Sequence, residues 1–86
     1  MRVSTNERVI LSLLANHGAS YGLQLVEASG NRLKRGGIYV TLGSMEQKGL
    51  VTSELQDDGR RVYQLTGIGH RALAAMEIMN AVGEVD

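Results

Sequence analysis

Hydrophobic residues in the first part of the chain recur every three or four positions, which is the spacing of one face of an α-helix. The first set comprises Val9, Ile10, Leu13 and Leu14. Ser4 and Glu7 precede it with the spacing of a capping box, and Gly18 follows it where a helix can end. We therefore predict a helix over residues 5–16 that buries one side.

Two further helices are expected after a short turn. Ser20 can cap the second of them. Its inward side would carry Leu23 and Val26, with Leu25 beside them. The small polar cluster at residues 29–31 then ends this helix after about ten residues.

The third helix is expected over residues 34–48. Its inward face is marked by Ile38, Leu42 and Met45, which follow one another at i, i+4 and i+7. Gly49 stands immediately after it as a stop. The result is a pair of short helices joined by a tight turn.

Beyond Gly49 the repeat changes from helical to alternating. Residues 51–55 alternate in polarity, and a second run of this kind follows at residues 61–65. Asp58 and Gly59, between the two runs, form a dipeptide typical of hairpin turns. The pattern predicts a two-stranded β-hairpin.

A fourth helix is expected over residues 66–82, with Thr66 as its cap. One side of this helix carries Ala72, Leu73, Met76 and Met79. A second apolar side carries Ala75, Ile78 and Val82. Because a helix with two apolar sides needs two partners, we expect one side to pack on the core and the other on a second copy of the chain.

Composition bounds the class of protein. A chain of 86 residues is expected to form one domain, residues 1–86, and 43% hydrophobic with 21% charged residues is typical of a folded globular domain. The chain has no cysteine, no hydrophobic run of membrane-spanning length and no signal-peptide pattern. We expect a cytoplasmic protein without membrane contact.

The net charge is zero, so the distribution of charge is more informative than its sum. The charged residues between positions 30 and 45 are Arg32, Lys34 and Arg35. Arg60 and Arg61 form a second basic pair in the predicted hairpin, beside Asp57 and Asp58. The two basic clusters suit a nucleic-acid backbone, and the two acids would have to point away from it.

Three helices followed by a hairpin is the element order of a winged helix-turn-helix domain. The expected fold class is therefore mainly α with a small β-hairpin (α+β). A three-helix core is followed by a two-stranded wing and a C-terminal dimerisation helix. In such domains the third helix enters the major groove of DNA, and the hairpin reaches the backbone or a minor groove.

Short motifs along the chain add detail to this order. Residues 21–25 read Tyr-Gly-Leu-Gln-Leu, residues 36–39 read Gly-Gly-Ile-Tyr, and residues 46–51 read Glu-Gln-Lys-Gly-Leu-Val. Further on stand Gly59, Arg60, Arg61, Tyr63, Leu65, Thr66 and Gly69. In order and spacing these motifs resemble the second helix, recognition helix and wing of the PadR-type transcriptional regulators. The resemblance implies a DNA-binding homodimer that regulates transcription, often as a repressor.

The candidate reading surface is the face of the third helix opposite its buried positions. It presents Gly36, Val40, Gly43, Ser44 and Gln47, with Tyr39 and Thr41 on its flanks. Val40 can meet a thymine methyl group, and Ser44 or Gln47 can hydrogen-bond to bases. Tyr39 fits half-buried packing as well as a phosphate contact.

Phosphate contacts are assigned to the basic residues. At the entrance of the third helix these are Arg32, Lys34 and Arg35, of which Arg35 can also reach a guanine edge. Arg60 and Arg61 follow the hairpin tip, from which at least one should project toward DNA. Tyr63 is assigned to the core.

Catalytic and metal-binding arrangements are not found in the sequence. His17 and His70 have no cysteine or paired carboxylate at ligand spacing, so no metal or other cofactor is expected. No hydroxyl, histidine and carboxylate form a recognisable nucleophile arrangement. We do not expect an enzyme.

One recognition helix touches only a few base pairs, so we expect a homodimer on a pseudo-palindromic double-stranded DNA site. The predicted dimer residues are Ala75, Ile78, Met79 and Val82. Two other interpretations stay open: a winged-helix module that binds another protein instead of DNA, and a structural dimer within a larger assembly. Binding of a small-molecule effector also stays open.

Overall fold

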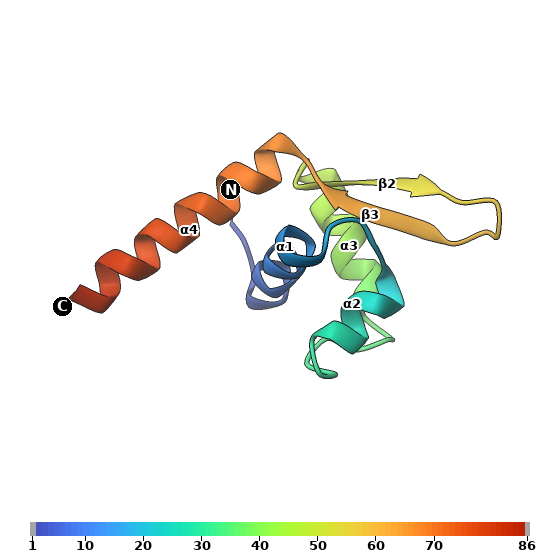
Figure 1. Ribbon diagram of the computed structural model, residues 1–86, viewed down its shortest axis with the longest axis horizontal. Helices are drawn as coiled ribbons and strands as arrows, with labels where there is room; N and C mark the ends of the chain where they lie inside the picture. The colour runs from blue at the N-terminus through green and yellow to red at the C-terminus, as the bar shows by residue number, and fades with distance from the viewer. Residues whose placement is uncertain (1, 86) are drawn as a thin grey trace.

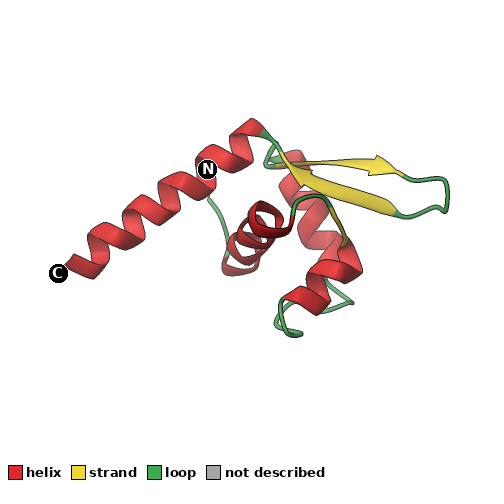
Figure 2. Cartoon of the chain, in the orientation of Figure 1, coloured by secondary structure: helices red, strands yellow, loops and turns green. Residues whose placement is uncertain are grey.

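A computed structural model of the chain describes the backbone of residues 2–85 and the side chains of residues 2–79. A body of short helices carries a hairpin on one side, and a long helix leaves it on the other (Figures 1 and 2). In chain order the elements are α1 (Thr5–His17), β1 (Ser20–Tyr21), α2 (Gly22–Ala28), α3 (Ile38–Gln47), β2 (Val51–Leu55), β3 (Arg61–Leu65) and α4 (Gly67–Val85). This confirms the predicted α+β winged-helix order and adds a strand to it.

The capping box predicted before α1 is present. Ser4 Oγ accepts a hydrogen bond from the Glu7 backbone N–H at 3.2 Å, and Glu7 Oε1 accepts one from the Ser4 N–H at 2.8 Å. Gly18 ends the helix with a φ of 80°, which residues with a side chain rarely adopt. These local signals fix both ends of α1.

The segment after Gly18 forms a short strand that the sequence pattern did not predict. Ser20 pairs with Tyr63 of β3, and the next residue pairs with Val62. Ser20 donates its hydroxyl to the Gly18 carbonyl at 2.9 Å, and the N-cap of α2 is Tyr21. The predicted cap at Ser20 is therefore wrong. The predicted hairpin is present, and β1 adds a third strand to its sheet, which the sequence pattern could not show because two residues are too few for alternation.

The second helix is shorter than predicted, at seven residues. Leu25 and Val26 are buried, but Leu23 is 43% exposed, so its predicted inward position is wrong. The reason is geometric: residues two apart lie about 200° apart around a helix, so Leu23 and Leu25 cannot share the inward side.

The third helix begins at Ile38 and not at residue 34. The N–H groups of Gly37 and Ile38 both donate to the Lys34 carbonyl, at 3.1 and 3.0 Å, so the basic segment forms a turn before the helix. Consecutive glycines at positions 36 and 37 disfavour helix, which explains the late start. The predicted inward face of α3 and the stop at Gly49, whose φ is 76°, are confirmed.

The sheet has the order β1-β3-β2, and both pairs of strands are antiparallel. Val51 lies opposite Leu65 at one end of the hairpin, and Leu55 lies opposite Arg61 at the other. The turn contains Gly59 with a φ of 85°, as the Asp-Gly dipeptide predicts. The wing, residues 51–65, is thus joined to the body along β3 by β1.

One hydrophobic core joins the helices to the sheet. Its buried residues are Ile10, Leu11, Leu14, Leu25, Val26, Leu33, Ile38, Leu42, Met45, Leu50, Val51, Tyr63 and Leu73. Tyr63 belongs to this core, as expected. Among the described side chains of α4, those that reach it are Leu73 and the partly buried Ala72 and Met76.

Gly69 allows α4 to approach the body closely. Thr66 Oγ1 accepts a hydrogen bond from the Gly69 N–H at 3.0 Å, which caps α4 as predicted. The first turn of α4 thereby lies against Leu50, the residue before β2. A Cβ at Gly69 would overlap the carbonyl oxygen of Leu50, which is backbone and cannot move aside. The start of α4 therefore tolerates no side chain at this position.

We expect Gly69→Ala to lower the free energy of unfolding by about 1–3 kcal/mol, the usual cost of forcing extra atoms into a packed site. Urea denaturation followed by circular dichroism, at fixed protein concentration, measures it. Gly43→Ala is the matched control, because a Cβ at Gly43 meets nothing within 4 Å and should stabilise α3. Equal stability of Gly69→Ala and the parent chain would contradict the packing described.

Candidate nucleic-acid interface

The side chains on the exposed face of α3 opposite its buried positions are uncharged. Val40 is 77% exposed and lies opposite the buried positions, on the same side of the helix as Gly43 and Gln47. Tyr39 is 52% exposed, and its ring lies against Gly22 at the start of α2. We call Tyr39, Val40, Gly43 and Gln47 the reading face.

Gly36 and the three basic residues predicted to hold phosphates lie outside the helix. Arg32, Lys34 and Arg35 are exposed in the segment between α2 and α3, and we call them the linker cluster. Asn31, just before them, has a φ of 65°, which reverses the chain after α2. Among the described side chains none forms an ion pair with the linker cluster, so its charge is available to a ligand.

The two wing arginines have different environments. Arg61 NH1 donates to Ser53 Oγ at 3.3 Å, and that hydroxyl donates to Glu46 Oε2 of α3 at 2.9 Å. Arg60 instead pairs with Asp58, at 2.7 Å between Nη2 and Oδ2. Both guanidinium groups are thus engaged within the wing, Arg61 with a neutral group and Arg60 with a carboxylate.

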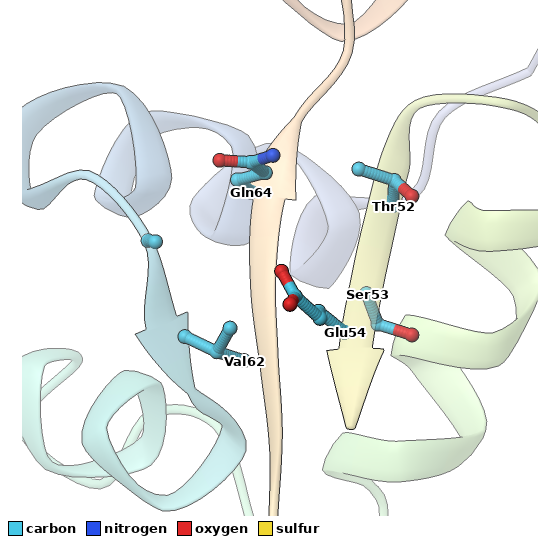
Figure 3. Close-up of a pocket in the computed structure, with 6 residues that line it drawn as sticks. Thr52, Ser53, Glu54, Val62 and Gln64 are labelled. Atoms are coloured by element: carbon cyan, nitrogen blue, oxygen red, sulfur yellow. The ribbon is translucent and has the colours of Figure 1, made fainter. Parts of the chain in front are cut away.

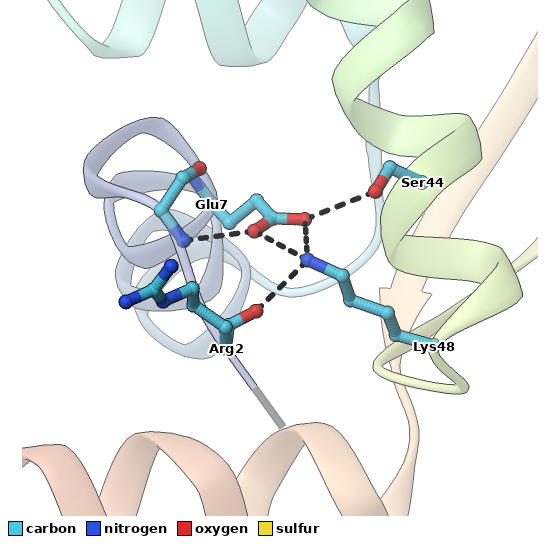
Figure 4. A network of polar contacts seen from close by, with 5 residues as sticks. Arg2, Glu7, Ser44 and Lys48 are labelled. Carbon is cyan, nitrogen blue, oxygen red and sulfur yellow. Dashed lines mark hydrogen bonds and ion pairs between the residues drawn. The ribbon is translucent and has the colours of Figure 1, made fainter.

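A buried ion pair joins α1 to the end of α3 (Figure 4). Glu7 is only 3% exposed, and Lys48 Nζ donates to both of its carboxylate oxygens at 2.8 Å. Lys48 Nζ also donates to the Arg2 carbonyl at 2.9 Å, which holds the segment before α1. A single ammonium group therefore connects three segments of the chain.

Glu7 remains ionised because its surroundings compensate for burial. Burial by itself raises the pKa of Glu7, but the hydrogen bonds from Lys48 and Ser4, with the charge of Lys48, bring the pKa below its ordinary value. Ser44 Oγ donates to the second oxygen of the same carboxylate at 3.4 Å. The structure thus turns the Ser44 hydroxyl toward α1, whereas the sequence analysis assigned it to base contact.

Sequence reasoning missed Glu7, Lys48 and Glu46 as parts of this region. The capping-box spacing accounts for Glu7 as a helix cap and gives no sign of its second role. Its partners lie 37 and 41 residues away, so only the tertiary fold brings them together. Glu46 follows the buried Met45 on α3, and a carboxylate at such a position is ordinarily expected to be exposed to solvent.

The outer face of the sheet contains a shallow hollow of about 310 Å³ (Figure 3). Thr52, Glu54, Val62 and Gln64 project into it from β2 and β3, while Ser53 points from β2 toward the other side. Its single charged group is a carboxylate, so it does not suit a phosphate. No group of three potential metal ligands occurs among the described residues.

Beyond the turn that packs on the core, α4 carries exposed apolar side chains. Ile78 and Met79 are 65% and 73% exposed, and Ala75 is exposed between them and the core-facing turn. The side chain of Val82, also predicted at the dimer interface, lies outside the described residues. Of the helices described, none is long and apolar enough to cross a membrane.

The comparison with known families decides what kind of protein has this geometry. The profile described as the transcriptional regulator PadR-like family matches residues 10–75, which run from α1 into α4. The chain belongs to the PadR-like family of transcriptional regulators. It is therefore a regulator of a DNA-binding family and not an enzyme.

Solved structures of PadR-type and related regulators share this fold. RosR of H. salinarum is 26% identical, with a TM-score of 0.82 over 94% of this chain and 76% of that one. A PadR family transcription regulator from Clostridium difficile is 28% identical, with a TM-score of 0.76 over 91% of this chain and 90% of that one. A PadR family regulator from Eggerthella lenta is 29% identical, with a TM-score of 0.74 over 91% and 70%. No curated protein sequence matches the chain.

We expect Glu7→Gln to lower the free energy of unfolding by about 1.5–3 kcal/mol near neutral pH, the range for hydrogen bonds to charged groups. Glutamine keeps the shape but leaves Lys48 without its counter-charge. Because the pKa of Glu7 is lower in the folded state than in the unfolded chain, its ionised form stabilises the fold. This stabilisation is complete above pH 4.5, the ordinary pKa, and is lost as the pH falls through the lower pKa of the folded state. Denaturant unfolding at neutral pH and at about pH 3 measures the difference.

Glu77→Gln, an exposed change on α4, is the control for loss of a negative charge. It should have little effect at either pH. If the Glu7→Gln variant differed from the parent chain by the same amount at both pH values, the ion pair would not be the source of the loss.

Proposed function

We propose that the protein acts in the cytoplasm as a homodimeric repressor that binds double-stranded DNA in a sequence-specific manner. In this proposal α3 lies in the major groove, and the wing lies on the backbone or in a minor groove. The observation that carries it is the reading face, an exposed helix surface beside the unpaired linker cluster. Membership of the PadR-like family does not favour the alternative of a protein-binding module without DNA contact.

The reading face fits the floor of a major groove. Gly43 leaves the backbone of α3 uncovered, so the helix can approach base edges closely. Val40 presents a branched apolar side chain that suits a thymine methyl group, and Gln47 supplies both a donor and an acceptor for a base. We assign base recognition to these residues and not to Ser44, whose hydroxyl is turned toward Glu7.

Phosphate binding is assigned to the linker cluster and the wing. Arg32, Lys34 and Arg35 stand where the chain enters α3, so they can hold the backbone beside the groove that α3 occupies. Arg61 is held by a neutral hydroxyl and keeps its full charge for a phosphate. These contacts would supply affinity that depends on salt, while α3 supplies the choice of sequence.

Dimerisation is assigned to α4. Its exposed apolar residues, Ile78 and Met79, lie beyond the turn that packs on the core, on a helix that extends away from the body (Figure 1). Two such helices packed together would relate two copies of α3 by a two-fold axis, which suits a pseudo-palindromic site. A dimer that covers such a site in a promoter excludes other proteins from it, so repression requires no surface beyond the DNA interface.

We expect Arg35→Ala together with Arg61→Ala to weaken binding to a random-sequence duplex and to reduce the slope of log affinity against log salt by about 0.9 for each lost phosphate contact, which is about 1.8 for each chain and about 3.6 for the dimer. Fluorescence anisotropy over a salt series measures both quantities. Arg71→Ala on α4 is the single-charge control and should leave the slope unchanged. A folded parent chain that shows no salt-sensitive binding would refute the DNA-binding proposal.

We expect Ile78→Glu together with Met79→Glu to convert the dimer to a monomer, because the substitutions place charge in the middle of an apolar contact. Analytical ultracentrifugation gives the mass of each form. Glu77→Gln, on the same turn of α4, serves as the control and should stay dimeric. A parent chain that sediments as a monomer at high concentration would exclude α4 as a dimer element.

A further inference from the structure

At the turn of the wing, Asp58 binds both the backbone and the side chain of Arg60. Asp58 Oδ2 accepts a hydrogen bond from Arg60 Nε at 2.8 Å and forms an ion pair with Nη2 at 2.7 Å. Asp58 Oδ1 accepts the backbone N–H of the same arginine at 3.0 Å. One carboxylate therefore binds both the main chain and the side chain of Arg60.

The other side of the guanidinium lies on an aromatic ring. Arg60 Cζ is 4.0 Å from the centroid of Tyr21, the residue that caps α2. A guanidinium over an aromatic ring is a favourable cation–π contact. Arg60 is thus folded back from the turn toward the body of the domain.

The Asp58 contact occupies one of the two guanidinium edges that can bind a phosphate through paired N–H donors. Guanidinium groups bind carboxylates and phosphates alike through parallel N–H donors, and here Nε and one terminal nitrogen are already taken. The hydrogen bonds from Arg60 lower the pKa of Asp58, and the same contact raises the pKa of Arg60. Both groups are therefore fully charged at neutral pH, and the pair is neutral as a whole.

We propose that Asp58 is a built-in competitor for DNA phosphate at Arg60, which keeps this arginine of the wing from contributing to binding while the pair is intact. The inference rests on the DNA-binding function proposed above and concerns its regulation. A phosphate on the edge that Asp58 occupies has to replace the carboxylate, and a phosphate on the other edge meets an arginine whose charge Asp58 already balances, so the wing gains little affinity from its first arginine. Binding without regard to sequence is weakened, and a larger share of the affinity is left to the reading face.

Asp57 provides a matched comparison within the same turn. It carries the same charge as Asp58 and is exposed, but it forms no ion pair with a described side chain. Asp57→Asn and Asp58→Asn change the net charge equally, and only the second releases Arg60. Asparagine at position 58 keeps an oxygen that can accept the Arg60 backbone N–H, so the turn is preserved.

The test measures anisotropy of a random-sequence duplex over a salt series for the parent chain, Asp57→Asn, Asp58→Asn, Arg60→Ala and the Asp58→Asn, Arg60→Ala double variant. We expect Asp58→Asn to steepen the salt slope by about 0.9 for each wing, or about 1.8 for the dimer, and to tighten binding roughly fivefold to tenfold at 0.1 M salt for each wing that gains a phosphate contact, well beyond Asp57→Asn. Arg60→Ala should change little in the parent chain but remove the whole gain in the Asp58→Asn background.

Three results would overturn the inference while the parent chain still binds DNA. Equal gains for Asp57→Asn and Asp58→Asn would show a general effect of charge. Weaker binding by Asp58→Asn would show that Asp58 positions Arg60 for DNA. An equal loss from Arg60→Ala in both backgrounds would show that Arg60 contacts DNA despite the pair. Absence of binding by the parent chain would instead overturn the proposed function, and the inference with it.

Discussion

The ion pair between Glu7 and Lys48 determines how the recognition helix sits on the body of the domain. The other contacts of α3 with the core are made by Ile38, Leu42 and Met45, and apolar contacts have little directional preference. A carboxylate that binds Lys48 at 2.8 Å and also accepts from Ser44 allows much less rotation of α3 about its axis. The direction in which the exposed face of α3 points therefore depends on a polar contact made on the neighbouring side of the same helix, where Ser44 and Lys48 lie close to Val40.

Ion pairs within the chain also explain how a protein with no net charge can present a basic surface. Two of its cations are neutralised by carboxylates of the same chain, Lys48 by the buried Glu7 and Arg60 by Asp58 at the exposed turn of the wing. The remaining acids include Glu46, which faces the wing and accepts from Ser53. The linker cluster has no such partner among the described side chains, so local charge at the entrance of α3 is positive although the sum is zero.

Local signals in the sequence predicted most of the elements, and long-range contacts account for what it missed. The capping box at Ser4 and the glycines after α1 and α3 determine where helices begin and end through contacts within a few residues. They can therefore be recognised from spacing alone. Strand β1 exists only because β3, some forty residues later, offers it a partner, and Glu7 is buried only because Lys48 returns to it. For the same reason the basic clusters could be found in the sequence, but the difference between Arg60 and Arg61 could not.

Residues 21 and 22 connect the two elements assigned to DNA. Tyr21 lies beneath the Arg60 guanidinium at the wing turn, and the ring of Tyr39 at the start of α3 lies against Gly22. A Cβ at Gly22 would stand 2.8 Å from that ring, so the small residue is what lets Tyr39 lie there. A phosphate that draws Arg60 away from Tyr21 therefore acts one residue from the contact that supports the reading face. A change at the wing can therefore be transmitted to α3 through residues 21 and 22, although Arg60 and Tyr39 are about twenty residues apart in the sequence.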